Sequence, residues 1–212
     1  MCGKIATGSE KMQSVGRQKF MAFEGLLGWA AAAVTQAKRV TAASDNLSSE
    51  AHRRANSPVG QDHRESILRY RLANQSFQTE RHLFCNAAHK LLEYRNWVQD
   101  LGFLDDALFE ELDNFAHDID VMRDMDEHVI EYFKGEGKRP HDWIHKDGGG
   151  SADASSTIDT KIGGRLDWEE LGAAAQRLLE KLKPLGPFYP TPEETAADLK
   201  AIINETASTP SG

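Results

Sequence analysis

The chain has little of what a disulfide-rich or membrane-spanning protein needs. It has only two cysteines, Cys2 and Cys85, far apart and in unlike contexts. They do not make a disulfide framework, so we expect a reducing compartment. The most apolar run, residues 26–34, is far shorter than the roughly 20 residues that cross a bilayer. The N-terminal lysines and arginine have no apolar core of signal-peptide length beside them, and we therefore expect a soluble, cytoplasmic protein.

Positive charge is also in short supply. The formal net charge is -8, which argues against a protein that coats nucleic acid regardless of sequence. It leaves room for an enzyme that binds RNA through a local basic pocket. The hydrophobic share, 40%, is ordinary for a globular protein, and 212 residues are enough for one domain with a substantial core.

Glycine and proline are missing from long stretches, and this predicts helices. Apolar residues at spacings of three and four predict one helix over residues 17–43 and a second over 63–100, with Gly102 as its C′ residue. A third helix is expected over residues 104–133. Residues 44–62 carry Ser, Asn, Pro and Gly and are expected to form a loop. Residues 1–16 are expected to be a flexible N-terminus.

Residues 135–166 interrupt the helical pattern. Within them, residues 157–162 alternate like a short strand before Gly163 and Gly164. Asp167 is then placed as the N-cap of a helix that runs to about residue 182, with Glu170 at the capping-box position. Pro192 begins a last short helix.

These patterns predict an all-α fold, an elongated helical bundle with a small extended hairpin inserted before the C-terminal helices. The bundle covers residues 17–182, the hairpin or loop insertion 135–166, and the C-terminal short helix and tail 183–212. Four aromatic residues are expected to anchor the hairpin and the last helices to the bundle: Trp143, Trp168, Phe188 and Tyr189.

The third predicted helix carries the residues that point most directly at chemistry. Arg123 and His128 lie five residues apart in it. Arginine binds phosphate bidentately, and histidine moves a proton near neutral pH. On a regular helix the two side chains would be roughly 140° apart around the axis. A single straight helix therefore does not aim both at one atom, so either the helix is distorted there or two copies of the chain pool their residues.

The segment from Arg123 through Asp124 to His128 resembles the Arg-x4–6-His motif of the HEPN (higher eukaryotes and prokaryotes nucleotide-binding) superfamily. That family commonly has Asn, Asp or His directly after the arginine, and this chain has Asp124. Its members are helical bundles, typically dimers, and many are metal-independent ribonucleases in toxin–antitoxin, phage-defence and RNA-processing systems. The resemblance covers residues 17–182, and the insertion at 135–166 departs from the family.

The resemblance implies a homodimeric endoribonuclease without metal or other cofactor. Arg123 would bind the scissile phosphate, His128 would transfer the proton, and Asp124 would orient the imidazole or position the arginine. RNA is the implied substrate, and an antitoxin protein is a further implied partner. On charge density alone, three residues of the second predicted helix are expected to line an RNA groove beside the motif: Arg81, His82 and His89.

Two other interpretations of the third helix stay open. Its His and Asp side chains could hold a divalent metal ion together with His141 and His145, in a set on one helix face: Asp113, His117, Asp120, Asp124 and His128. Alternatively, Arg123 pairs with Glu127 and Asp124 with His128 as ordinary contacts on a helix surface. The protein would then be a non-catalytic helical bundle that binds nucleotides or acts through protein contacts.

Overall fold

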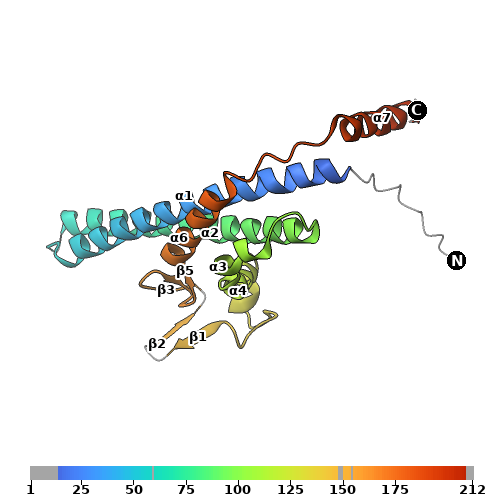
Figure 1. Ribbon diagram of the computed structural model, residues 1–212. Helices are drawn as coiled ribbons and strands as arrows, with labels where there is room; N and C mark the ends of the chain where they lie inside the picture. Colours follow the sequence, from blue (N-terminus) through green and yellow to red (C-terminus); the bar gives the residue numbers. More distant parts are fainter. Residues whose placement is uncertain (1–13, 59, 148–149, 154, 209–212) are drawn as a thin grey trace.

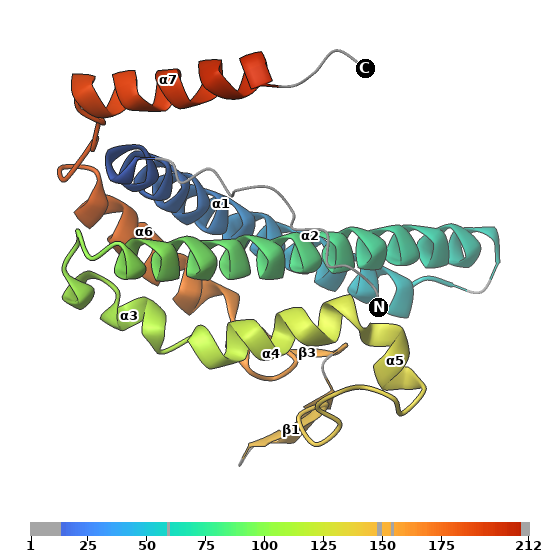
Figure 2. The same cartoon turned by 90° about the vertical axis from the view of Figure 1, so that its right-hand side faces the viewer.

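The computed structural model describes residues 14–58, 60–147, 150–153 and 155–208. Two long antiparallel helices, α1 (Val15–Ala55) and α2 (Gln61–Asp100), form the spine of the molecule (Figure 1). Helix α6 (Trp168–Leu182) packs on α1, and α4 (Ala116–Glu127) packs on α2 (Figure 2). Two small antiparallel sheets precede α6 in the chain. The predicted fold class, an elongated helical bundle with a small extended insertion before the C-terminal helices, is confirmed.

Helix α1 is longer at both ends than the sequence predicts. It begins after Ser14, whose hydroxyl accepts a hydrogen bond from the Arg17 amide at 3.3 Å. The prediction of a loop over residues 44–62 is wrong up to Ala55, where the helix ends. Arg54 lies over the ring of Tyr70 on α2, 5.0 Å from the ring centroid. Such contacts with α2 outweigh the weak helix propensity of Ser and Asn in this segment. Of the predicted flexible N-terminus 1–16, residues 1–13 lie outside the described residues, whereas Val15 and Gly16 belong to α1.

Helix α2 begins and ends close to where the sequence predicts. Gly102 is its C′ residue with φ of 60°, and its amide donates to the carbonyl of Val98 at 3.1 Å. The face of α1 that α2 and α6 cover is rich in alanine, so the helices approach closely. A Cβ placed on Gly172 of α6 would lie 2.6 Å from the Cβ of Ala37 on α1.

The third predicted helix is divided. The segment contains a 3-10 turn (Asp106–Leu108), α3 (Glu110–Asp113), α4, and α5 (Val129–Phe133). The chain leaves helical geometry at His128, with φ of -113° and ψ of 22°. Neither Gly nor Pro marks these breaks, and a single continuous helix is therefore a wrong prediction. The helix is thus distorted at His128, which is one of the two alternatives that the Arg123–His128 spacing leaves open.

The insertion forms a two-stranded hairpin and a three-stranded antiparallel sheet instead of the single predicted hairpin. Strands β1 (Ile144–Asp147) and β2 (Gly150–Asp153) pair antiparallel. The predicted strand over residues 157–162 is in fact two strands, β3 (Thr157–Ile158) and β4 (Lys161–Ile162), joined by a turn in which Asp159 has φ of 51°. Gly163 and Gly164, both with positive φ, then turn the chain into β5 (Leu166–Asp167).

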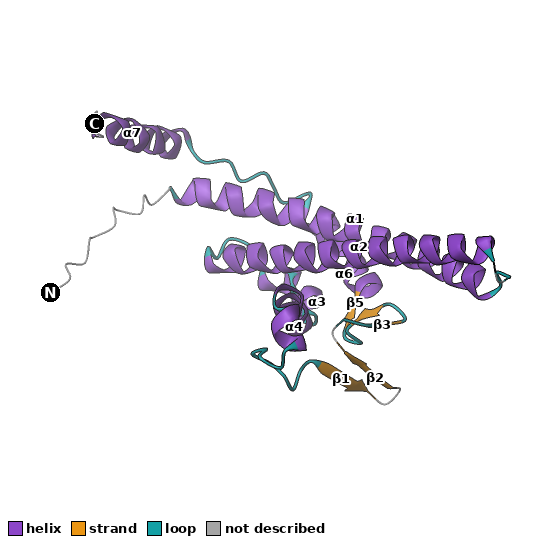
Figure 3. Ribbon diagram, turned by 180° about the vertical axis from the view of Figure 1, so that it is seen from behind, coloured by secondary structure: helices purple, strands orange, loops and turns teal. Residues whose placement is uncertain are grey.

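The C-terminal helices begin where the sequence predicts. The Asp167 carboxylate accepts hydrogen bonds from the amides of Glu169 and Glu170 at 3.0 and 3.1 Å. Helix α7 (Pro192–Ser208) follows, and α6 and α7 lie on either side of a short extended segment (Figure 3). Within the described ranges, no helix combines the length and apolar character needed to cross a membrane.

All four predicted aromatic anchors contact side chains of α1 or α5. Trp168 is 2% exposed, and its indole N–H donates to Thr41 of α1 at 3.0 Å. Trp143 stacks on Tyr132 of α5 with ring centroids 5.1 Å apart. The other two pack on α1, Phe188 against Phe23 and Tyr189 against Phe20.

Candidate active site

The motif lies where α4 runs antiparallel along α2. His89 Nε2 is 3.9 Å from Asp120 Oδ1, and His82 Nδ1 is 3.5 Å from Asp126 Oδ2. Because Arg123 lies midway between these two aspartates in α4, it sits at the same helix pair. The hydrogen bond from Lys90 is the main cause that lowers the pKa of Glu93 on α2, and the nearby charge of Arg123 makes a smaller contribution.

Arg123 and His128 are both at the surface, and each is held by a neighbouring carboxylate. Arg123 Nε donates to Glu127 Oε1 at 2.8 Å, and both side chains are 40% exposed. His128 Nδ1 lies 3.2 Å from Glu131 Oε1, with 34% of the histidine side chain exposed. Among the described residues, no hydrogen bond or ion pair joins Arg123 to His128. The predicted Arg123–Glu127 pair is confirmed.

Asp124 has a partner that the sequence does not predict. Its Oδ2 accepts a hydrogen bond from the Tyr132 hydroxyl at 2.7 Å, and that hydroxyl accepts one from the Arg139 amide at 3.1 Å. Residues eight apart on a straight helix are about 12 Å apart along its axis, so the break at His128 makes the contact possible. Burial and the hydrogen bond to Asp124 raise the pKa of Tyr132. The Asp124 carboxylate therefore connects α4 to α5. One interpretation expected it to pair with His128, and that expectation is wrong, because His128 pairs with Glu131.

The three residues predicted to line an RNA groove have different positions on α2. Arg81 is 7% exposed, and its Nη1 donates to the Ser155 carbonyl at 2.6 Å. Its Nη2 lies 3.9 Å from Asp126 Oδ1. Arg81 thus joins α2, α4 and the insertion inside the protein. The side chain of His82 is 51% exposed and that of His89 is 13% exposed, both next to α4.

Sequence periodicity holds a signal for the position of Arg81. It follows Phe77 by four residues and precedes Phe84 by three, so it shares the helix face of two buried aromatics. The orientation of His82 is also fixed by its neighbours. Asn86 Nδ2 lies 3.0 Å from His82 Nε2, which makes Nε2 the acceptor and leaves the ring proton on Nδ1, toward Asp126.

The metal alternative finds no support in the part of the chain that the structure describes. No group of three or more His, Cys, Asp or Glu side chains is arranged there to hold a metal ion. Cys85 is buried next to Asp126, and burial raises the pKa of its thiol well above the usual value. Such a thiol stays protonated and acts as a small packed side chain.

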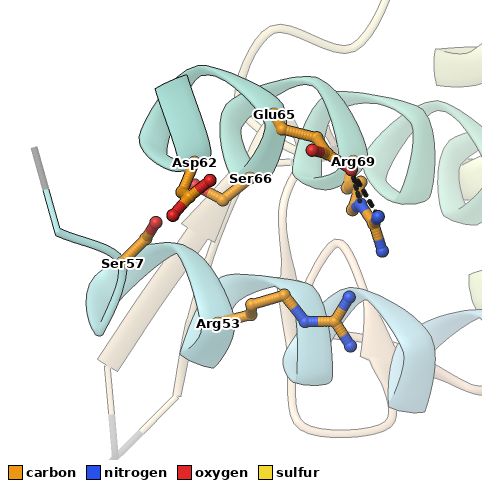
Figure 4. Close-up of a pocket in the computed structure, with 6 residues that line it drawn as sticks. All are labelled: Arg53, Ser57, Asp62, Glu65, Ser66 and Arg69. Carbon is orange, nitrogen blue, oxygen red and sulfur yellow. Dashed lines mark hydrogen bonds and ion pairs between the residues drawn. The ribbon is translucent and has the colours of Figure 1, made fainter. Parts of the chain in front are cut away.

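The main cavities of the described residues lie away from Arg123 and His128. One open pocket of about 280 Å³ lies at the turn between α1 and α2 (Figure 4). Arg53 and Arg69 share it with Asp62 and Glu65, so its charges balance. A groove of about 570 Å³ lies between α1 and α6, lined in part by Val34, Ala37, Gly172 and Ala173. Neither collects groups of one charge or a nucleophile beside a base.

The comparisons with known proteins give no relative for this chain. No protein-family model matches it, and no curated protein or solved structure matches it significantly. The assignment of a function therefore depends on the residues themselves.

Proposed function

We propose that the protein is a metal-independent endoribonuclease of the HEPN type that acts as a homodimer, with Arg123 and His128 as its catalytic pair. One observation carries the proposal. An arginine and a histidine, which as side-chain types can bind phosphate and transfer a proton, are both partly exposed at the end of α4, where the helix breaks at His128. Toxin–antitoxin and phage-defence systems are the settings that fit such an enzyme.

Arg123 keeps free donors for a phosphate although it is paired. Its hydrogen bond to Glu127 uses Nε alone, which leaves both terminal nitrogens of the guanidinium as donors. Two parallel N–H groups at those nitrogens match two phosphate oxygens. Glu127 then holds the side chain in place. Its negative charge lies beside the site and opposes the binding of the phosphate.

His128 supplies the proton transfer. Its neutral imidazole takes the proton of the 2′-hydroxyl, and the 2′-oxygen attacks the neighbouring phosphorus. The bond from phosphorus to the 5′-oxygen breaks, and that oxygen takes a proton from solvent. The products are a 2′,3′-cyclic phosphate and a 5′-hydroxyl. Arg123 balances the charge that builds up on the phosphoryl oxygens.

A second copy of the chain completes the site in this proposal. Within one chain, Arg123 and His128 are held by different carboxylates and do not meet. Exposed apolar side chains lie beside the motif: Ile130 is 66% exposed, Phe133 71% and Ile144 52%. We call these three residues the apolar rim. Apolar groups exposed to this extent support self-association at this end of the molecule.

A cleavage assay in EDTA with single-stranded RNA tests the proposal. The parent protein is expected to cut and to leave 2′,3′-cyclic phosphate ends, and His128→Ala is expected to lose at least about 100-fold in rate. His141→Ala is the matched control, because His141 is exposed and lies outside the motif. Equal rates for His128→Ala and the parent, or no cleavage by the parent, would overturn the proposal.

A second candidate is a non-catalytic helical bundle that acts through protein or nucleotide contacts. The intrahelical pairs Arg123–Glu127 and His128–Glu131 favour it, because both are ordinary surface contacts. It predicts no cleavage by the parent protein, and Arg123 would then contribute only a weak surface ion pair.

A further inference from the structure

One face of α2 carries a row of polar side chains that no carboxylate of the helix interrupts between residues 64 and 89. At about 100° per residue, the spacings of this row keep all members within about 40° of one line along the helix. We call them the α2 stripe: Arg64, Arg71, Gln75, Gln78, His82 and His89. Leu68 and Asn86 complete this face, and no Asp or Glu lies on it between residues 64 and 89. The stripe is roughly 37 Å long at 1.5 Å per residue.

The two arginines of the stripe are uncommitted. Among the described residues, the guanidinium groups of Arg64 and Arg71 have no hydrogen-bond or ion-pair partner, and both residues are exposed. This differs from Arg69 on the same helix, which pairs with Glu65, and from Arg53, which pairs with Glu50 at 3.2 Å. An acidic chain of net charge -8 thus keeps two unpaired arginines on a part of this face where α2 itself has no carboxylate.

The stripe leads to the proposed catalytic pair. Its far end meets α4, where His82 and His89 face Asp126 and Asp120, on either side of Arg123 in sequence. Helix α4 runs antiparallel to α2, so its C-terminal end and α5 point toward the α1–α2 turn (Figure 2). The free arginines and the motif therefore lie along the same side of α2.

We propose that the α2 stripe binds the sugar–phosphate backbone of single-stranded RNA and guides it to Arg123. This inference rests on the proposed function for its direction, but the binding can be tested without cleavage. Arginine contacts phosphate, while the amides of Gln75 and Gln78 can donate to phosphate and ribose oxygens. Arg64 and Arg71 are about 10 Å apart along the helix, which suits contacts with successive parts of an extended strand.

The test measures the binding of a labelled single-stranded RNA to His128→Ala protein in EDTA, over a series of salt concentrations. The double change Arg64→Gln and Arg71→Gln is expected to weaken binding about tenfold and to make the slope of log affinity against log salt shallower by about 1.4. The control removes two charges from exposed lysines outside α2, by Lys183→Gln at the end of α6 and Lys200→Gln in α7. It should leave both the affinity and the slope near those of the parent.

The outcomes separate this inference from the proposed function. Equal affinity and slope for the stripe variant and the lysine variant would overturn the inference, and so would the absence of RNA binding. Binding that depends on Arg64 and Arg71, in a protein whose parent never cuts RNA, would support the stripe and refute the nuclease. If the stripe substitutions, made in a protein with His128 intact, leave cleavage and its KM unchanged, the nuclease is supported and the α2 stripe is refuted as an RNA-binding surface.

Discussion

At the residue scale, the ion pair between Arg123 and Glu127 has a role that depends on the function. Both side chains are 40% exposed, and a pair of this kind contributes roughly 0–1 kcal/mol to stability. Its loss therefore changes folding little in either proposal. In the proposed nuclease, the loss of Glu127 would instead remove a negative charge beside the bound phosphate.

Glu127→Gln is expected to strengthen RNA binding several-fold and to leave the free energy of unfolding nearly unchanged. The substitution keeps a hydrogen-bond acceptor for Arg123 and removes the negative charge beside the phosphate. Titration of labelled RNA and urea unfolding measure the two effects. Unchanged or weaker RNA binding would show that Arg123 does not contact the phosphate.

Tyr132→Phe is expected to lower the free energy of unfolding by about 1 kcal/mol, because it removes the hydrogen bond from the Tyr132 hydroxyl to Asp124. Tyr189→Phe is the matched control, since Tyr189 is 73% exposed and contributes its ring rather than its hydroxyl. Chemical unfolding of both variants compares them directly. An equal effect of the two substitutions would mean that the link between α4 and α5 has no energetic weight.

Residue chemistry alone identifies the motif but misplaces some of its neighbours. The sequence suggests Arg81 as an RNA contact because it is an arginine in a basic segment, whereas the structure buries it against the Ser155 carbonyl. The partner lies 74 positions away in the chain, so no local pattern predicts it. The contact of Asp124 with Tyr132 is missed because it depends on the helix break.

At the scale of helices, close packing between α1 and α6 depends on Gly172. Gly172→Ala is expected to destabilise the protein by about 1–3 kcal/mol, because the new methyl group would lie too near Ala37 and neither backbone yields easily. Gly28→Ala on α1 has no atom within 4 Å of the new methyl group and should stabilise by roughly 0.5–1 kcal/mol. Thermal or urea unfolding measures the decrease in stability for Gly172→Ala and the increase for Gly28→Ala. A Gly172→Ala protein as stable as the parent would contradict the close contact between α1 and α6.

Helix α7 is attached to the start of α1 through carboxylates. Glu194 accepts hydrogen bonds from the amides of Thr191 and Gly16 at 2.8 and 2.9 Å, and these bonds lower the pKa of its carboxyl group. Asp198 accepts from the Ser14 amide at 2.9 Å. The sequence predicts the N-terminus of α7 from Thr191 and Pro192, but it gives no sign that Glu194 also binds α1.

Because the pKa of Glu194 is lower in the folded protein, its contribution to stability is present above the unfolded value of about 4.3 and is lost as the pH falls through the folded value. The amide resonances of Gly16 and Thr191, followed by NMR from pH 7 to 3, are expected to shift together with a midpoint below about 4.3. Glu194→Gln should remove this titration, and Glu193→Gln should preserve it. A midpoint at or above the ordinary value would contradict the contact.

At two helix boundaries, tertiary contacts override the preference of the local sequence. Residues 44–55 contain loop-forming Ser and Asn, yet they are helical because Leu47 and Arg54 pack against other parts of the protein. The break at His128 goes the other way, since nothing in its composition stops a helix. In both places, the deciding interaction involves a residue that is distant in the sequence or beyond the next turn.

At the scale of the whole molecule, apolar periodicity is enough to predict an elongated bundle with an insertion. A surface for the proposed pairing of copies is not predictable in this way, because the apolar rim is assembled from α5 and β1. Phe133→Ser is expected to shift the proposed dimer toward monomer in sedimentation at micromolar concentration, since it removes the most exposed side chain of the rim. Leu199→Ser, at an exposed leucine on α7, should leave the mass unchanged. A monomeric parent would remove the basis for a shared site.

Complementation between two inactive variants tests the central claim most directly. Arg123→Ala and His128→Ala proteins are each expected to be inactive on single-stranded RNA in EDTA. After the two are mixed and their subunits exchange, half of the dimers are mixed, and each has one site with an intact arginine from one copy and an intact histidine from the other. The account predicts recovery of about a quarter of the parent activity under full exchange. No recovery from a mixture shown to contain mixed dimers would contradict a catalytic site built from two chains.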